Sequence, residues 1–264
     1  MKLAYAHGLD PVTTLFYRFV VAGLALSPIL IFRRSRPPLA RRQHLLMFGV
    51  GAVLNTLVVW SIFESLGYIS ASVAIMCLYL YPAIVSVLSG PVLGERPGCR
   101  SLIALLFSLG GVALMAWAPG ARVSLIGVTF AFLAAFFNAM SVLLYKKFLG
   151  GIQPMAASAE ILIWTALCFA GVAAVKGIQV NLAPVSWAVV GGLTLFSTII
   201  PFTALYAGLN LIQASRASIL STSEPLVTAL LAALLLGERL TLLQGLGAAL
   251  VLGSVFILSY KNPG

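Results

Sequence analysis

One stretch of the sequence indicates the kind of fold. Residues 70–96 read SASVAIMCLYLYPAIVSVLSGPVLGER, and the part from 70 to 93 contains no charged side chain. About 20 such residues in a helix cross the hydrocarbon core of a bilayer. Glycine commonly ends a helix, and here Gly94 is followed at once by Glu95 and Arg96. The stretch therefore predicts a transmembrane helix that ends near Gly94.

The rest of the chain repeats this pattern. Hydrophobic residues make up 61% of the 264 residues and charged residues 8%, whereas soluble domains carry about 25% charged residues. Lipid must therefore solvate most of the surface. We predict an all-α, polytopic transmembrane helix bundle with nine visible spans, at residues 12–32, 44–66, 70–93, 100–118, 124–145, 154–175, 185–210, 214–236 and 241–260.

The basic residues predict the orientation. If the loop with Arg33 and Arg34 is cytoplasmic, cytoplasmic ends hold eleven of the sixteen Lys and Arg residues and the other side holds four: Lys2, Arg122, Lys176 and Arg239. This bias fits the positive-inside rule. We therefore expect a multi-pass protein of the cell (inner) membrane with a cytoplasmic C-terminus. The net charge of +10 follows from the same loops and does not indicate a nucleic-acid partner.

The chain also contains an internal repeat. Residues 214–239 read ASRASILSTSEPLVTALLAALLLGER, and a shift of 143 residues places Gly94-Glu95-Arg96 on Gly237-Glu238-Arg239 and Pro82 on Pro225. We predict a first repeat at 1–120 and a second at 121–264. The second has five spans, an odd number, so the copies run in opposite directions through the membrane, as in many secondary transporters.

The first copy shows only four spans. The partner of the span at 124–145 would precede residue 1. This 4 + 5 arrangement predicts a ten-helix fold whose first helix is missing from this sequence. A nine-span protein is the alternative.

Both copies resemble a known family. The patterns Ser70-Ala71-Ser72-Val73-Ala74 with Pro82, and Ala214-Ser215-Arg216-Ala217 with Glu224-Pro225, each ending in Leu-Gly-Glu-Arg, look like the signature of the EamA family of the drug/metabolite transporter superfamily. Arg18 resembles the arginine of that family's second helix. The resemblance implies a ten-span inner-membrane exporter of amino acids, metabolites or toxic compounds, and it leaves the solute open.

Two candidate solute-binding residues lie before the repeated prolines. Glu224 precedes Pro225 near the middle of its span and shares a polar stripe with Ser221. It is a proton or cation partner, or else a structural carboxylate bound to neighbouring hydroxyls. Tyr81 holds the equivalent position before Pro82, facing a cavity or packing as an aromatic side chain.

Arg18 and Glu64 both fall in the outer third of their spans, and an ion pair between them would neutralise two costly intramembrane charges. That pair is either an outer gate or a packing bridge. Trp60 lies one helical turn before Glu64 on the same face and is a further candidate for solute binding.

Three other features remain open. Asn138 belongs to a polar stripe that lines a cavity or bonds neighbouring helices. Glu160 and Trp164 share a face that lines a cytoplasmic vestibule, or Glu160 forms a bridge to Lys147, which we favour. Gly245, Ala249 and Gly253 permit close packing within the bundle or between two protomers in a homodimer.

These features together favour a secondary transporter that exports a small solute such as an amino acid or toxic amine, with possible proton coupling. No Walker phosphate loop or metal-ligand spacing occurs, so we expect no cofactor and no metal. A membrane-embedded enzyme acting on lipid or isoprenoid is the alternative. It would need clustered Asp, His or Arg at the membrane surface, and the one aspartate and two histidines are dispersed.

Overall fold

A computed structural model describes residues 10–31, 40–117, 123–179, 182–227 and 241–259. These residues form helices joined by turns, with no strand among them. In chain order the elements are α2 (Pro11–Ile31), α3 (Arg41–Phe48), η1 (Gly49–Asn55), α4 (Thr56–Leu66), α5 (Ala71–Leu78), α6 (Tyr81–Leu93), α7 (Cys99–Ala116), α8 (Leu125–Leu144), η2 (Tyr145–Leu149), α9 (Pro154–Lys176), α10 (Pro184–Thr194), η3 (Leu195–Ile199), α11 (Ile200–Leu211), α12 (Ala214–Leu220) and α14 (Leu242–Ser259).

The helices confirm the predicted all-α, polytopic membrane bundle. Six helical segments are long and apolar enough to cross a membrane: Val12–Leu30, Arg41–Leu66, Ala71–Leu93, Leu125–Leu149, Pro154–Lys176 and Pro184–Leu211. Cys99–Met115 and Leu242–Leu258 are shorter apolar helices. The predicted span at 214–236 is described as far as residue 227, and its remainder lies outside the described residues.

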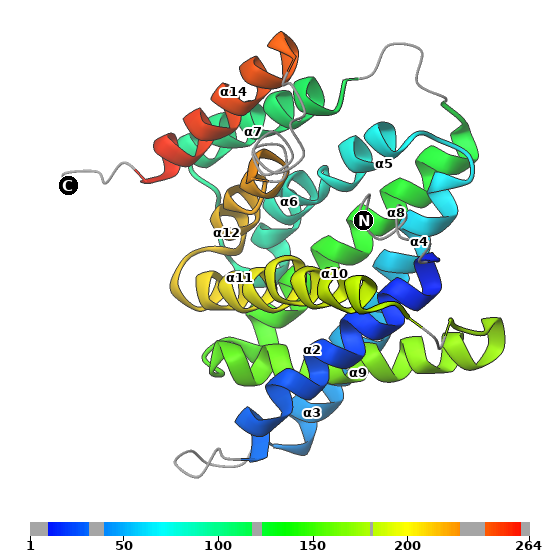
Figure 1. The fold of residues 1–264 in the computed structure, drawn as a ribbon. Helices are drawn as coiled ribbons and strands as arrows, with labels where there is room; N and C mark the ends of the chain where they lie inside the picture. Colours follow the sequence, from blue (N-terminus) through cyan, green and yellow to red (C-terminus); the bar gives the residue numbers. More distant parts are fainter. Residues whose placement is uncertain (1–9, 32–39, 118–122, 180–181, 228–240, 260–264) are drawn as a thin grey trace. The chain divides into compact units, whose positions relative to one another are not determined.

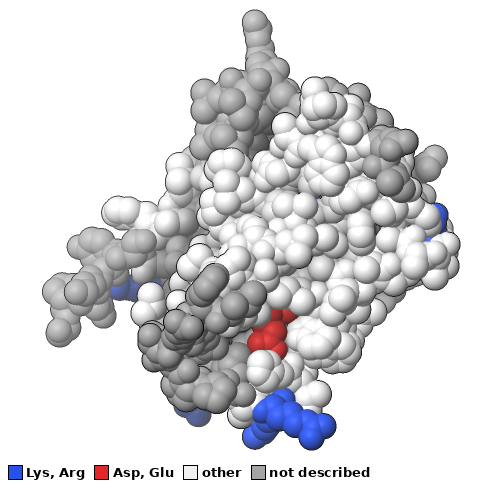
Figure 2. Space-filling view, turned by 60° about the horizontal axis from the view of Figure 1, so that its bottom comes forward, with Lys and Arg blue, Asp and Glu red and all other residues white. Residues whose placement is uncertain are grey.

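Large apolar side chains on the surface fit a lipid environment. Val87 is 74% exposed, Leu106 69% and Phe256 68%, values that would leave broad apolar patches in contact with water if the protein were soluble. On the face drawn in Figure 2, uncharged side chains make up almost all of the described surface, and acidic and basic residues show only as small patches.

The chain divides into two compact units. Unit 1 comprises residues 1–56 and 144–211, and unit 2 comprises residues 57–143 and 212–264. Each unit therefore takes segments from both halves of the chain. A compact unit and a sequence repeat are different divisions, so the repeats at 1–120 and 121–264 stay a prediction.

In unit 1, α9 packs along α2 and against η1, α3 and α11 (Figure 1). Its buried surface includes a run of small residues that lets neighbouring backbones approach. The closest approach is at Gly51 in η1, where an added Cβ would overlap the carbonyl oxygen of Ile161. Only glycine fits this position without displacing α9.

The irregular segment η1 is a π-helical turn whose carbonyls are bound by α9. The Thr165 hydroxyl donates to the Gly51 carbonyl at 2.9 Å, and the Cys168 thiol donates to the Ala52 carbonyl at 3.2 Å. A π-turn leaves backbone groups without their α-helical partners, and lipid cannot supply replacements. These side chains of α9 therefore allow the turn to exist inside a membrane span.

In unit 2, α7 and α14 lie side by side (Figure 1). Their contact is centred on two glycines: a Cβ at Gly111 would lie 2.6 Å from the Gly247 carbonyl oxygen, and a Cβ at Gly247 would lie 2.5 Å from the Gly111 carbonyl oxygen. Close backbone packing at small residues stabilises helix pairs in membranes. These two glycines therefore set the distance between α7 and α14.

The small-residue stripe predicted on α14 lies elsewhere. A Cβ added at Gly245 would have no atom within 4 Å, and one added at Gly253 would meet only the Phe107 ring, at 3.4 Å. Within unit 2 the close contact is made by Gly247, two residues along from Gly245. Spacing alone identifies a repeated set of small residues and does not identify which helix face meets a neighbour.

Gly247→Val should separate α7 from α14 and lower the thermal unfolding midpoint in detergent, since overpacking costs about 1–3 kcal/mol. Gly245→Val is the matched control, because it adds the same side chain to the same helix where there is open space. Fluorescence-detected size exclusion after heating measures both midpoints. Equal midpoints for the two variants would contradict the described packing of α7 on α14.

Candidate functional site

The first predicted candidate lies at a break in a membrane span. Helix α5 ends at Leu78, Tyr79 and Leu80 form a turn, and α6 begins at Tyr81. Pro82 has no N–H, so it cannot bond the Leu78 carbonyl four residues before it. The span is therefore two half-helices joined by a turn that contains exposed backbone polar groups.

The second predicted candidate lies at a matching break. Helix α12 ends at Leu220, Ser221 and Thr222 form a turn, and the helix resumes at 223 with Glu224 and Pro225. The Glu224 N–H donates to the Ser221 carbonyl at 3.1 Å, a tight turn in place of an α-helical bond. Pro225 is 143 residues after Pro82, so both breaks occur at equivalent places in the repeated pattern.

Side chains from the two breaks meet within unit 2. The Tyr79 hydroxyl donates to Oε2 of Glu224 at 3.2 Å, and the Tyr81 hydroxyl donates to the Ser218 carbonyl at 3.2 Å. The two tyrosine rings lie 6.3 Å apart. We call Tyr79, Tyr81, Ser218 and Glu224 the break site.

The break site combines buried phenols with an accessible carboxylate. Tyr79 and Tyr81 are buried, at 8% and 5% exposure, whereas Glu224 is exposed. A carboxylate oriented by a phenol can accept a proton or bind a cationic group, and aromatic faces nearby add attraction for a cation. The arrangement contains no nucleophile with an adjacent base of the kind that an acyl-transfer enzyme uses.

Sequence reasoning missed Tyr79. It lies two residues before Tyr81, a spacing that puts two side chains on different faces of a regular helix. The turn at Tyr79–Leu80 changes the direction of the chain and brings both rings to the same site. The only signal in the sequence is Pro82, which predicts a local break without giving its geometry.

The other candidates in unit 2 are placed as follows. The Ser221 hydroxyl donates to the Ala217 carbonyl of its own helix at 3.1 Å, so its hydrogen goes to the backbone. Trp60, 42% exposed, and Glu64 lie on α4, and Asn138 lies on α8. A role of these residues in solute binding stays a prediction.

Arg18 is held by a π-helical turn of unit 1. Its Nε donates to Thr198 Oγ1 at 2.5 Å, and its Nη2 donates to the carbonyl and the hydroxyl of Ser197 at 2.5 and 3.2 Å. Thr194 returns a bond from its hydroxyl to the Arg18 carbonyl at 3.2 Å. The guanidinium thus satisfies η3 and joins α2 to it. Glu64 belongs to unit 2, so the predicted pair with Arg18 stays a prediction.

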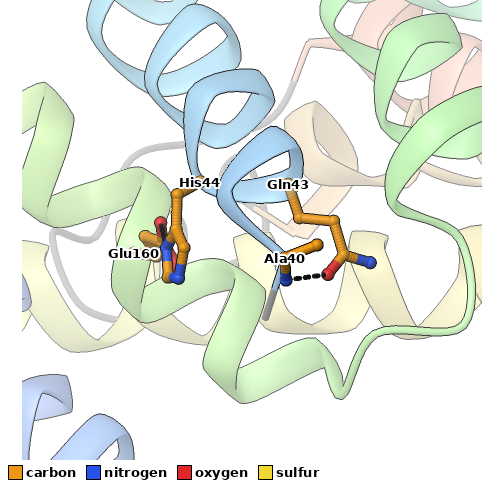
Figure 3. Close-up of polar contacts among 4 residues, drawn as sticks. All are labelled: Ala40, Gln43, His44 and Glu160. Carbon is orange, nitrogen blue, oxygen red and sulfur yellow. Dashed lines mark hydrogen bonds and ion pairs between the residues drawn. The ribbon is translucent and has the colours of Figure 1, made fainter. Parts of the chain in front are cut away.

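Helix α3 contacts α9 through two pairs one helical turn apart. Nδ1 of His44 lies 2.5 Å from Oε1 of Glu160 (Figure 3), and the rings of Phe48 and Trp164 meet edge to face at 5.1 Å. We favoured Lys147 as the partner of Glu160; the structure places His44 there, and the Lys147 ammonium lies 5.6 Å from the centre of the Phe148 ring. A vestibule role of Trp164 stays a prediction.

Known proteins resemble the chain over nearly its whole length. A sequence profile of the EamA-like transporter family matches residues 1–117 and 125–260. An uncharacterized transporter of Archaeoglobus fulgidus is 28% identical, covering 95% of this chain and 87% of the relative. The uncharacterized transporter YcbK of Bacillus subtilis is 27% identical, covering 99% and 88%.

A third relative and a solved structure agree with this result. The uncharacterized inner membrane transporter YicL of Salmonella typhimurium is 31% identical, covering 73% of this chain and 65% of the relative. One crystal structure superposes with a TM-score of 0.81 at 17% identity, over 95% of this chain and 89% of the other. At that identity the superposition shows the fold alone.

Thr198→Val should leave the Nε–H of Arg18 without its acceptor and destabilise unit 1 by about 1–3 kcal/mol. Thr129→Val is the control, because the Thr129 hydroxyl is exposed and bonds its own helix. Unfolding in mixed micelles of increasing SDS content measures both. A Thr198→Val protein as stable as the control would show that the contact between Arg18 and Thr198 contributes nothing to folding.

Proposed function

The chain belongs to the EamA-like transporter family, and on that premise we propose that it exports a small solute as a secondary transporter working by alternating access. It is a multi-pass membrane protein, and its family and relatives are transporters of the membrane. The proposal adds a direction, a mechanism and a binding site. In it the solute binds at the break site.

The pair of matching helix breaks carries this proposal. Secondary transporters commonly bind their solutes where discontinuous helices expose polar groups near the middle of the membrane. Here the two breaks contain Pro82 and Pro225 at equivalent places, and they bring Tyr79 and Glu224 into contact. A purely structural interface would have no need for two interrupted helices at the same depth.

The chemistry of the break site favours a solute with a cationic group. Glu224 supplies a carboxylate, Tyr79 orients it, and the ring of Tyr81 lies beside that of Tyr79. An amino acid or an amine offers the ammonium group that such a site binds by charge and by cation–π attraction. Proton coupling fits the same residue, because a proton and a cationic solute would compete for Glu224.

Alternating access also needs two related halves, and several observations support the inverted repeat. The family profile matches in two segments, 1–117 and 125–260. Helix α2 packs on α9 and α7 packs on α14, and the members of each pair are separated by 143 residues in the repeated pattern. Contacts between equivalent helices are typical of repeats that fold together around a shared axis.

Uptake into inside-out vesicles tests the function. Vesicles containing the expressed protein are offered amino acids and organic amines with an imposed proton gradient. Uptake of one class that exceeds uptake by vesicles without the protein would establish transport, and its loss on collapsing the gradient would establish coupling. No uptake of any cationic solute by correctly inserted protein would contradict the proposed solute class.

Glu224→Gln should abolish most transport while leaving insertion normal, because the amide cannot attract a cation or take up a proton in the same way. Tyr79→Phe should lower transport roughly tenfold by removing a bond to a charged group. Tyr68→Phe is the control, since Tyr68 is 40% exposed in the same unit and stacks on Phe130. Wild-type transport by Glu224→Gln would remove the break site from the mechanism.

The proposed orientation places Cys99 in the cytoplasm. Cys99 is exposed at the start of α7, between Arg96 and Arg100, whereas Cys77 and Cys168 are part-buried. A membrane-impermeant maleimide should label Cys99 in inside-out vesicles and should fail to label it in right-side-out spheroplasts. Cys99→Ser gives the background. Labelling in spheroplasts alone would reverse the proposed topology.

A further inference from the structure

Glu160 is unusual among the acidic and basic residues that the structure describes, because it alone is buried, with 6% of the residue exposed. Unit 1 contains one other acid, Asp10, which caps the start of α2 by accepting from the Thr13 N–H. A carboxylate inside a membrane protein is costly without a partner. Glu160 has no part in the proposed break site, so its burial calls for a separate explanation.

The partner of Glu160 is a titratable group with access to solvent. Nδ1 of His44 lies 2.5 Å from Oε1 of Glu160 (Figure 3), and the His44 side chain is 50% exposed while that of Glu160 is 8% exposed. Accepting from Nδ1–H, the carboxylate fixes the tautomer and leaves Nε2 as the free base. An added proton therefore goes to Nε2 and changes the net charge of the pair from −1 to 0.

The pair is one rung of a longer contact that joins α3 and η1 to α9. The next rungs are Phe48 against Trp164, the Gly51 carbonyl with the Thr165 hydroxyl, and the Ala52 carbonyl with Cys168. None of these bonds involves a charge. Protonation of His44 turns its bond to Glu160 into a charge-assisted one, which is about twice as strong as a neutral bond.

The other groups near this contact are mostly cationic and are bound elsewhere. The Arg42 guanidinium lies 5.7 Å from the centre of the Phe148 ring, and the Lys146 ammonium donates to the Leu209 carbonyl. The charged and titratable side chains of the elements packed on α3 and α9 are Arg41 and Arg42 of α3, Lys146, Lys147 and Tyr145 of η2, Arg18 of α2 and Tyr206 of α11. Among them no second acid competes with Glu160 for His44.

We propose that the His44–Glu160 pair is a proton-binding site, with the proton carried on Nε2 of His44, through which the pH at the α3 end of unit 1 sets how firmly α3 is held to α9. A bound proton tightens the contact, and its loss leaves a buried net negative charge and loosens the first rung. On the proposed orientation this end faces the cytoplasm. The site is distinct from the break site, and only the transport readout rests on the proposed function.

Hydrogen–deuterium exchange of α3 measures the holding directly. At about pH 5 and about pH 8, which bracket the titration of imidazoles, each protein is compared after correction for the intrinsic exchange rate. In the wild type, the protection of residues 41–48 should be roughly tenfold greater at the lower pH, as expected for a charge-assisted against a neutral bond. Peptides of α7 and α14 serve as the internal reference.

Three variants make the test specific. His44→Gln should show weak protection of α3 at both pH values, and His44→Lys, a permanent cation in this range, should show strong protection at both. His7→Gln removes the other histidine of the chain and should keep the wild-type response. A pH response of α3 in His44→Gln equal to that of the wild type would overturn the proposal, as would its loss in His7→Gln.

Transport gives a second and separable readout. If the vesicle assay finds a solute, the pH dependence on the α3 side should flatten in His44→Gln and in His44→Lys. Failure of the transport proposal would leave the exchange result intact, because exchange needs no solute. A wild-type pH profile in both His44 variants would contradict a link between this site and transport.

Discussion

Every irregular turn inside the hydrocarbon core must find its hydrogen-bond partners within the protein, because lipid supplies none. This constraint explains where the intramembrane polar side chains lie. The π-turn η1 is satisfied by Thr165 and Cys168 of α9, and η3 receives the guanidinium of Arg18. At the break in the second half of the chain, the Tyr81 hydroxyl bonds the Ser218 carbonyl near the end of α12.

The same constraint separates structural from functional polar groups. Arg18 makes three bonds to Ser197 and Thr198 of η3, so its described contacts explain its presence as a brace between α2 and η3. Glu224 accepts from Tyr79 and remains exposed, so that bond does not account for its cost in the membrane. A carboxylate kept at an interrupted helix is better explained by a ligand that binds it than by packing.

The sequence predicted what depends on hydropathy and on offset. The spans were predictable because about 20 apolar residues are a requirement of thickness, and Glu224 was found by its place before a repeated proline. Three features were out of reach. Tyr79 depends on the direction of a turn, the contact of Gly111 with Gly247 depends on which faces of α7 and α14 meet, and His44 reaches Glu160 from 116 residues away. Each depends on tertiary packing that periodicity does not encode.

The most direct test of the central claim is to locate solute binding within the chain. Amide exchange is followed along the purified protein with and without the solute that it transports. The account predicts added protection at residues 79–83 and 221–226, the two helix breaks, and loss of that protection when Glu224 is neutralised. Protection confined to other segments, with both breaks unchanged, would contradict the assignment of the break site as the place where the solute binds.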